Sequence, residues 1–246
     1  MLNYLRLEVL RTFRDRRFVF FAVFFPVMLF LLWSNIADDG STEKTTHLNA
    51  AKYMMVAFGV YGAIGAVMST TGPRLATELQ TGWLRQLQVT PLPARTVITV
   101  KTMTAIVVAL PALVLVGLTA AFTKDVTLSP LEWVGTIVLL ALGSLPFAAL
   151  GTLIGSSIKG DSAQPAILMA YFPLAIVGGL WIPVSNLPSF MRTLAPWTPS
   201  NRLAEIGWDI VGGSAPSAAA GLVLLAWTVG LGGLAVLAYR RATVLA

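Results

Sequence analysis

The side chains that could do acid–base, nucleophilic or metal chemistry are few in this sequence. It has no cysteine, which excludes thiol catalysis, thiolate metal sites and disulfides. Its single histidine, His47, shares a polar stretch with Asp38, Asp39 and Glu43; we interpret it as a solvated loop residue, with a metal or pH role as the alternative. The sequence contains no HExxH zinc pair and no GxxxxGK[ST] phosphate loop. We therefore expect a chain that binds no metal or cofactor and is neither an enzyme nor an ATPase.

One pair of carboxylates keeps an alternative open. Glu205 and Asp209 lie four residues apart between two apolar stretches. A membrane enzyme that acts on lipid needs acid–base groups at the interface, and this pair is the candidate for them. A membrane-embedded lipid enzyme is thus the alternative to a chain that is not an enzyme.

The elements that must position these residues are strongly hydrophobic. The 246 residues are 56% hydrophobic and 11% charged, with a mean hydropathy of +0.77, whereas soluble domains are about 25% charged. Six windows contain no Asp, Glu, Lys or Arg, and each suffices to cross a membrane, which takes about 20 helical residues. These windows lack the alternation of apolar and polar residues that the strands of a membrane β-barrel show. We predict a single all-α polytopic membrane domain of six transmembrane helices: 18–37, 53–73, 102–123, 133–156, 165–183 and 216–238.

Prolines shape two of these spans. The first apolar window runs for 20 residues from Phe18. A signal peptide core has roughly 7 to 15, so we interpret the window as a retained span that is kinked at Pro26. The fifth window, Ser162–Met191, is long for one span and contains Pro173, so its helix is predicted to end near Pro183.

Lysines and arginines are distributed unevenly between the connecting segments. With six spans, twelve fall on one side, mainly in residues 1–17 and 74–101, and five on the other. Because cytoplasmic loops carry the excess of positive charge, both termini are predicted to be cytoplasmic in a multi-pass protein of the cytoplasmic membrane. The same bias accounts for the net charge of +6, so no nucleic-acid partner is expected.

Residues 1–17 have the pattern of an amphipathic helix. Such a helix lies in the membrane interface, with its apolar side toward lipid and its guanidinium groups near anionic headgroups. A solvated basic tail is the alternative. The apolar positions are Leu2, Leu5, Val9, Leu10 and Phe13, and the basic positions are Arg6, Arg11, Arg14 and Arg17.

The predicted spans contain no ionisable residue. Carriers driven by protons or ions usually place one within the membrane, so ion coupling is disfavoured. Without a phosphate loop of its own, the chain would take its energy from another subunit. The few polar residues in the spans would bond to helices or line a path: Ser69, Thr70, Thr71, Ser144 and Gln164.

The basic connection between the second and third spans has a proline-rich end. Because proline disfavours a helical conformation in the residue before it, the prolines at 91 and 93 predict that one short helix over residues 75–88 ends before them. Leu84 and Leu87 would share a face of that helix and enter a groove on a partner, or rest on the membrane surface. Glu78 would pair with a cation on the partner or with Arg85.

This connection resembles the signature of the ABC-2 type permeases, the membrane subunits of type V ABC transporters. In that family an acidic residue precedes Gly-x-Leu, followed by Leu-x-x-Thr-Pro-Leu and a lysine that opens the third span. The matching residues are Glu78, Gly82, Leu84, Leu87, Thr90, Pro91, Leu92 and Lys101, while Trp83 and Gln88 depart from the pattern. Residues 1–17 are similar to the family's elbow helix. The external segment after the fifth span matches at Gly179, Pro183, Leu187, Pro188, Pro196 and Pro199.

The resemblance implies three groups of site residues. Those that couple to the ATPase, in the cytoplasmic coupling loop 74–101, are Glu78, Gly82, Trp83, Leu84, Arg85, Leu87, Thr90 and Pro91. Those on the substrate path, in spans two and five, are Met54, Phe58, Tyr61, Met169, Tyr171 and Phe172. An external gate, in or beside re-entrant helices over 184–212, would use Pro183, Leu187 and Pro188. For the tryptophans of that segment, an aromatic belt at the outer interface is the alternative.

The function implied by the resemblance is that of a permease subunit of an ATP-driven exporter. Two copies of a cytoplasmic ABC ATPase would bind ATP and Mg, and a second permease chain, expected to be another copy, would complete a homodimer. A cavity without charges suits a hydrophobic or amphipathic cargo: a drug or antibiotic, as in efflux and antibiotic resistance, a peptide, or a lipid-like molecule. Export of a lipid-linked polysaccharide, a passive channel or scaffold, and the lipid enzyme are the alternatives.

Overall fold

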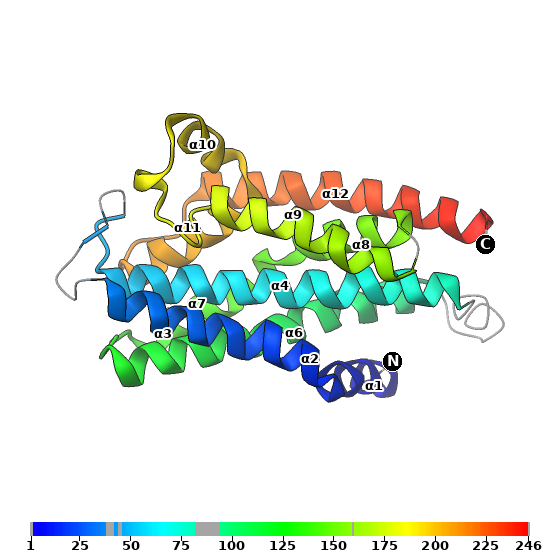
Figure 1. Ribbon diagram of the computed structural model, residues 1–246, viewed down its shortest axis with the longest axis horizontal. Coiled ribbons are helices and arrows are strands. Elements are labelled where there is room, and N and C mark those ends of the chain that lie inside the picture. Colours follow the sequence, from blue (N-terminus) through cyan, green and yellow to red (C-terminus); the bar gives the residue numbers. More distant parts are fainter. Residues whose placement is uncertain (1, 38–41, 44–45, 82–93, 159, 246) are drawn as a thin grey trace.

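The long helices of this protein run side by side in one bundle (Figure 1). The computed structural model describes the chain except for residues 1, 38–41, 44–45, 82–93, 159 and 246. In this described part the chain is helical, with one isolated bridge between Thr42 and Asn49 and no strand. The α-helices are α1 (Leu2–Arg14), α2 (Arg16–Val19), α3 (Phe25–Ile36), α4 (Ala50–Gln80), α6 (Ala94–Thr123), α7 (Pro130–Gly143), α8 (Leu145–Ser157), α9 (Ala163–Val177), α10 (Ser189–Leu194), α11 (Pro199–Val211) and α12 (Ala218–Leu245). A π turn, η1 (Phe20–Phe24), and three 3-10 turns, η2 (Gly160–Ser162), η3 (Val184–Asn186) and η4 (Ala195–Trp197), complete the described elements.

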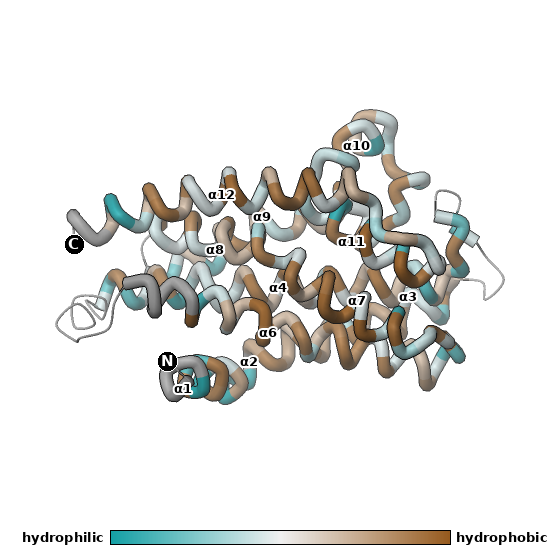
Figure 2. The backbone as a smooth tube through the Cα atoms, turned by 180° about the vertical axis from the view of Figure 1, so that it is seen from behind, coloured by the Kyte–Doolittle hydropathy of each residue, from teal (hydrophilic) through white to brown (hydrophobic). Residues whose placement is uncertain are grey.

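Four helical stretches among the described residues are long and apolar enough to cross a membrane. They correspond to the second, third, fourth and sixth predicted spans: Ala50–Gln80, Val100–Thr123, Pro130–Ser157 and Ala218–Ala242. The first predicted span contains a shorter apolar helix, Phe20–Ile36, and the fifth contains α9, with 15 residues. Apolar residues extend along the bundle and hydrophilic ones gather toward its two ends (Figure 2). The all-helical, multi-pass prediction is confirmed, and the count of six spans stays a prediction.

α4 lies at the centre of the bundle. It packs against α3, α6, α8, α9 and α11. Phe58 and Met68 on this helix are fully buried. The helix begins after Asn49, whose side chain accepts a hydrogen bond from the Lys52 backbone N–H at 3.0 Å, as a helix N-cap does. Because α4 contacts so many neighbours, a shift of this helix changes the spacing of several others.

The prediction of a separate helix over residues 75–88 is wrong for its first part. Residues 75–80 are the last turns of α4, which continues through Pro73. Leu75 and Ala76 are 2% and 1% exposed, so they pack within the bundle. Their burial extends the helix into a region where the charge pattern predicted a loop. Residues 82–88 lie outside the described part of the chain.

The N-terminal segment changes helical geometry twice before α3. Asp15 separates α1 from α2 and accepts a hydrogen bond from the Phe18 backbone N–H at 3.2 Å. Directly before Pro26 the helix widens in η1, where the Phe25 N–H bonds to the Phe20 carbonyl. The residue at which the sequence predicted a kink, Pro26, thus directly follows a π turn, a common cause of helix bending.

α1 turns a polar face toward the bundle. Glu8 is 8% exposed and Thr12 is fully buried, whereas Leu7 and Leu10 are exposed. The helix packs against α6. The sequence pattern did not predict this inner polar face, and the position of the helix in the membrane interface stays a prediction.

α9 ends earlier than the sequence predicted. It stops at Val177, not near Pro183, because two glycines follow and Gly179 has a φ of 78°, a backbone conformation that favours glycine. The Tyr53 hydroxyl donates to the Gly179 carbonyl at 2.8 Å and fixes this turn against α4. The chain then forms η3, α10, η4 and α11 at the end of the bundle opposite the two termini (Figure 1).

Candidate functional site

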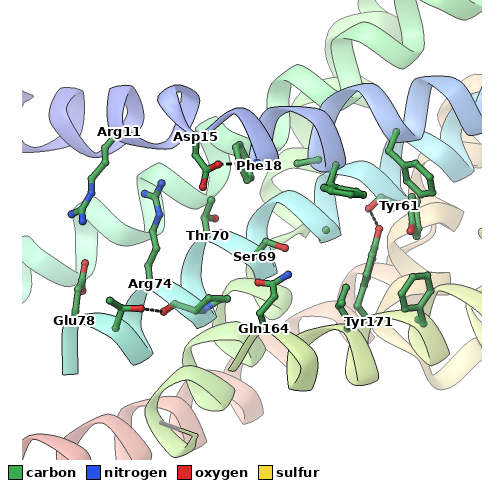
Figure 3. Close-up of a pocket in the computed structure, with 18 of the residues that line it drawn as sticks. Arg11, Asp15, Phe18, Tyr61, Ser69, Thr70, Arg74, Glu78, Gln164 and Tyr171 are labelled. Atoms are coloured by element: carbon green, nitrogen blue, oxygen red, sulfur yellow. Dashed lines mark hydrogen bonds between the residues drawn. The ribbon is translucent and has the colours of Figure 1, made fainter. Parts of the chain in front are cut away.

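A cavity of about 1010 Å³ lies between three walls of the bundle (Figure 3). The N-terminal wall, from α1 to α3, contributes Arg11, Asp15, Phe18, Phe21, Ala22 and Phe25. The second wall, α4 with its C-cap, contributes Tyr61, Gly65, Ser69, Thr70, Pro73, Arg74, Thr77, Glu78 and Thr81. The third wall, α9, contributes Gln164, Leu168, Tyr171 and Phe172. Three segments far apart in the sequence therefore share one space.

α4 presents a single stripe of residues to this cavity. Every fourth residue faces it, from Tyr61 through Gly65 and Ser69 to Pro73, which places them on one side of the helix. A Cβ atom at Gly65 would lie 2.9 Å from the hydroxyl oxygen of Tyr171. Glycine at position 65 thus lets the Tyr171 side chain approach α4 closely.

Aromatic rings close one end of the cavity, which we call the aromatic end. The Tyr171 hydroxyl donates to the Tyr61 carbonyl at 2.5 Å, and the two rings stack with centroids 4.7 Å apart. Phe172 lies beside Tyr171, and Trp181 meets Tyr61 edge-on at 5.6 Å. The buried indole nitrogen of Trp181 has no hydrogen-bond partner among the described residues. Van der Waals contact and ring stacking dominate this end.

Ionisable side chains line the opposite end, near α1, which we call the charged end. Arg11, Asp15, Arg74 and Glu78 belong to it and lie around the same space (Figure 3). The expectation of a cavity without charges is therefore wrong. It failed because the second span was predicted to stop at Pro73, whereas α4 continues and brings Arg74 and Glu78 into the wall.

Two ion pairs connect the charged end to neighbouring helices. The Glu78 carboxylate lies 2.7 Å from the Lys101 ammonium, which joins the last turn of α4 to α6. Arg74 lies 3.7 Å from Glu8, which joins α4 to α1. The ends of three helices are therefore linked through α4.

The match to known proteins agrees with this arrangement. Residues 33–238 match the family described as "ABC-2 family transporter protein". The chain belongs to this ABC-2 family. It is also 29% identical, over 220 residues that make up 89% of each chain, to a protein of Bacillus subtilis (strain 168) named "Putative transport permease YvfS". Membership of the ABC-2 family supports a transmembrane permease subunit rather than an enzyme, and it implies an ABC ATPase as partner.

The predicted substrate-path residues of the ABC-2 chain divide into two groups. Half of them line the cavity: Tyr61, Tyr171 and Phe172. Phe58 is 1% exposed within the core and Met54 is partly buried against it. Met169 is 78% exposed, because it lies about 200° around α9 from Tyr171. Both helices assigned to the path, α4 and α9, contribute to the cavity wall, and their packing decides which faces meet the cavity.

Only Glu78 among the predicted ATPase-coupling residues of this ABC-2 permease is described by the structure. The others lie outside the described part of the chain: Gly82, Trp83, Leu84, Arg85, Leu87, Thr90 and Pro91. Glu78 bonds to Lys101, a partner that the sequence argument did not assign, although both residues matched the family pattern. Glu8 was missed altogether. Its isolation as the one glutamate among the arginines of residues 1–17 was the available signal.

The predicted gate residues lie in the post-α9 segment, residues 178–211. Pro183 caps η3, Leu187 is 5% exposed, and the exposed Pro188 precedes α10. The Ser185 hydroxyl donates to the Glu43 carboxylate at 2.7 Å, which joins the segment to the stretch before α4. A gate at this position stays a prediction.

Aromatic residues of the post-α9 segment point both inward and outward. Trp208 is 5% exposed, stacks on Tyr53 with centroids 4.5 Å apart, and donates its indole N–H to the Tyr53 carbonyl at 3.1 Å. Phe190 and Trp197 are 60% and 69% exposed. The first arrangement anchors the segment to α4, and the second is typical of an aromatic belt.

The polar side chains in the spans behave in two ways. Most bond to carbonyls of their own helices, as the packing interpretation predicted: Thr70, Thr71 and Ser144. Ser69 and Gln164 line the cavity, and so does Thr70. A hydroxyl that bonds to its own helix can therefore also be part of the cavity wall.

The carboxylates suggested for lipid chemistry have structural partners. Glu205 forms an ion pair with Arg202, and Asp209 accepts a hydrogen bond from the Ser217 backbone N–H at 2.9 Å. His47 is exposed, with a φ of 56°. Within the described ranges, no three His, Cys, Asp or Glu side chains are placed to hold a metal ion.

Proposed function

We propose that this ABC-2 family chain is the permease subunit of an ATP-driven exporter. It moves a hydrophobic or amphipathic molecule, such as an antibiotic, a peptide or a lipid-like compound, out across the cytoplasmic membrane. Two copies of a cytoplasmic ABC ATPase bind ATP and Mg, and a second copy of the chain completes the path. The observation that carries the proposal is the cavity of about 1010 Å³ between α4 and α9 in a chain of this family.

Exposed apolar residues beside the cavity support the second copy. Phe21 and Phe24 on the N-terminal wall are 65% and 52% exposed, and Met169 on α9 is 78% exposed. One chain therefore offers a partly open cavity with apolar rims on two sides. A second copy seated on both rims by twofold symmetry would enclose the space and cover these side chains.

The ion pairs at the charged end support mechanical coupling. Residues 82–93 connect the end of α4 to the start of α6, and the Glu78–Lys101 pair holds those two helices together beside this connection. Closure of the ATPases on nucleotide binding would press on the connection and move both helices as a unit. Because α4 is also a cavity wall, its movement relative to α9 would switch the cavity from inward-facing to outward-facing.

One observation favours a second candidate function. The charged end provides polar contacts for a headgroup, which a lipid-linked polysaccharide would bring together with a lipid tail. Export of such a molecule would use the same walls and the same ATPase partner. Transport assays with the two cargo classes separate these functions, since the subunit assembly is common to both.

Co-purification tests the central assignment. The tagged chain is co-expressed with a candidate P-loop ABC ATPase from the same organism, and ATP-driven uptake of an amphipathic dye is measured in inside-out vesicles. We expect a stable complex, and we expect Glu78→Arg to reduce uptake because the reversed charge repels Lys101. Arg192→Glu, on α10 at the other end of the bundle, is the matched control. A chain that purifies without the ATPase, or full uptake by Glu78→Arg, contradicts the proposal.

A further inference from the structure

We propose that the cavity selects a zwitterionic, single-tailed amphiphile. Its headgroup, with one positive and one negative charge, lies at the charged end between Arg11, Asp15 and Arg74. Its tail extends toward Tyr61 and Tyr171 at the aromatic end. This inference deepens the proposed export function and rests on it, because it names the class of cargo that the same cavity takes.

The first support is that all three walls change chemistry in the same direction. The N-terminal wall changes from Arg11 to Phe25, α4 from Arg74 to Tyr61, and α9 from Gln164 to Tyr171. The charged and aromatic residues lie at opposite ends of the close-up in Figure 3. A cavity with one polar and one apolar end matches a molecule that is itself polar at one end and apolar at the other.

The second support is the length of the cavity. Glu78 and Tyr61 both line it and are separated along α4 by 17 residues, which correspond to about 25 Å at 1.5 Å per residue. Such a length accommodates an extended tail in addition to a headgroup. A compact, round molecule would reach only one of the two ends.

The third support is the balance of charge around the headgroup position. Two cations, Arg11 and Arg74, and two anions, Asp15 and Glu78, line this end of the cavity. A headgroup with a net charge would enter a wall that offers no net opposite charge, and its desolvation would be poorly compensated. A headgroup with both charges finds a partner of opposite sign for each.

Arg11 and Asp15 provide the most accessible pair of opposite charges. Both side chains are exposed and both line the cavity. They lie four residues apart on the same wall, Arg11 in the last turn of α1 and Asp15 at the junction with α2. A headgroup whose phosphate and ammonium are close neighbours can contact both at once through charge-assisted hydrogen bonds and ion pairs.

Tryptophan quenching with three matched probes tests the selectivity. The probes share one alkyl tail with a terminal nitroxide and carry a phosphocholine, a phosphate or a trimethylammonium headgroup. They are titrated into the full chain in maltoside micelles. We expect the phosphocholine probe to bind about tenfold tighter than either single-charge probe, the effect of one additional charged contact. Part of its quenching should vanish in Trp181→Phe, because Trp181 contacts the aromatic end, and persist in Trp197→Phe.

Two substitutions, one that removes a positive charge and one that removes a negative charge, should shift the probe preference in opposite directions. Arg11→Gln leaves an excess of negative charge and should shift preference to the trimethylammonium probe. Asp15→Asn should shift it to the phosphate probe, while asparagine still caps α2. Each should weaken phosphocholine binding by about tenfold. Arg192→Gln, far from the cavity, should change nothing.

Three results would overturn the inference: equal binding of all probes, tighter binding of one single-charge probe to the unmodified chain, or no effect of either substitution. Association with the ATPase is measured on the same samples. A chain that associates with the ATPase but shows no phosphocholine preference refutes only the cargo class. A chain that does not associate refutes the export function itself.

Discussion

The two ends of the bundle are held together by different kinds of contact. At the charged end, separate helices are joined through the tips of long side chains, in the Glu78–Lys101 and Arg74–Glu8 pairs. At the other end, the post-α9 segment is joined to α4 through side chains that bond directly to backbone. Trp208 donates to a carbonyl of α4, and Tyr53 donates to a carbonyl of the segment.

This difference indicates which end can transmit movement. Each pair joins a buried carboxylate to a partly exposed cation through the tips of their side chains, and such a contact can re-form after its helices shift. A buried ring that also bonds to backbone fixes the position of the chain itself. The charged end is therefore suited to follow the ATPase, while the post-α9 segment provides a stable reference. The predictions below test this contrast, from the largest expected effect to the smallest.

Trp208→Ala should have the largest effect on stability. Trp208 is 5% exposed and stacked on Tyr53, and removal of a buried tryptophan lowers the free energy of unfolding by about 3 to 5 kcal/mol. Denaturant titration in detergent micelles measures the loss. Trp197→Ala, at a ring that is 69% exposed, is the control and should change the free energy by less than about 0.5 kcal/mol. Equal losses in both variants would mean that the post-α9 segment is not anchored through Trp208.

Tyr53→Phe should give the second largest effect. The substitution keeps the ring and leaves the Gly179 carbonyl without its donor, which lowers the free energy of unfolding by about 1 to 3 kcal/mol. The same titration measures it. Thr193→Val, which removes an exposed hydroxyl from α10, is the control and should have little effect. An unchanged Tyr53→Phe protein would show that the turn after α9 is fixed by glycine conformation alone.

The sequence predicted the features that depend on composition within one segment. The charge-free windows located the long apolar helices, and the family pattern pointed to Tyr61, Tyr171 and Phe172, which line the cavity. It also singled out Glu78 and Lys101. These results follow from local hydrophobicity and from motif residues, both of which can be read along a single stretch of chain.

What the sequence could not predict depends on packing between segments. The extension of α4 to Gln80 follows from burial of Leu75 and Ala76 by neighbouring helices. The pairing of Glu78 with Lys101 joins residues 23 positions apart. The close approach of Tyr171 to Gly65 joins two helices that are far apart in the sequence. No single stretch of chain contains the information for such contacts.

Substitutions at the Glu78–Lys101 pair should affect both the free energy of unfolding and ATP-driven uptake, and exchange of the two charges tests whether uptake depends on the pair. Glu78→Gln leaves a half-buried lysine without its anion and should lower the free energy of unfolding by about 1 kcal/mol. It should also reduce ATP-driven uptake, because α4 and α6 no longer move together. The double variant Glu78→Lys with Lys101→Glu restores an ion pair and should recover uptake. A double variant as inactive as the single one would show that the identity of Glu78, not the pair, matters.

Glu8→Gln should have the smallest effect, and salt should reveal its origin. The Arg74–Glu8 separation of 3.7 Å and the 24% exposure of the Arg74 side chain predict a loss of about 0.5 kcal/mol in the free energy of unfolding at low salt. Because salt screens exposed charges over about 10 Å at 0.1 M and 3 Å at 1 M, the difference from the unmodified chain should shrink toward zero in 1 M salt. Trp208→Ala should keep its full effect in the same buffer, since ring burial is not screened. If the Glu8→Gln loss also persisted in 1 M salt, α1 would be anchored by packing of Glu8, and the contrast between the two ends would not extend to α1.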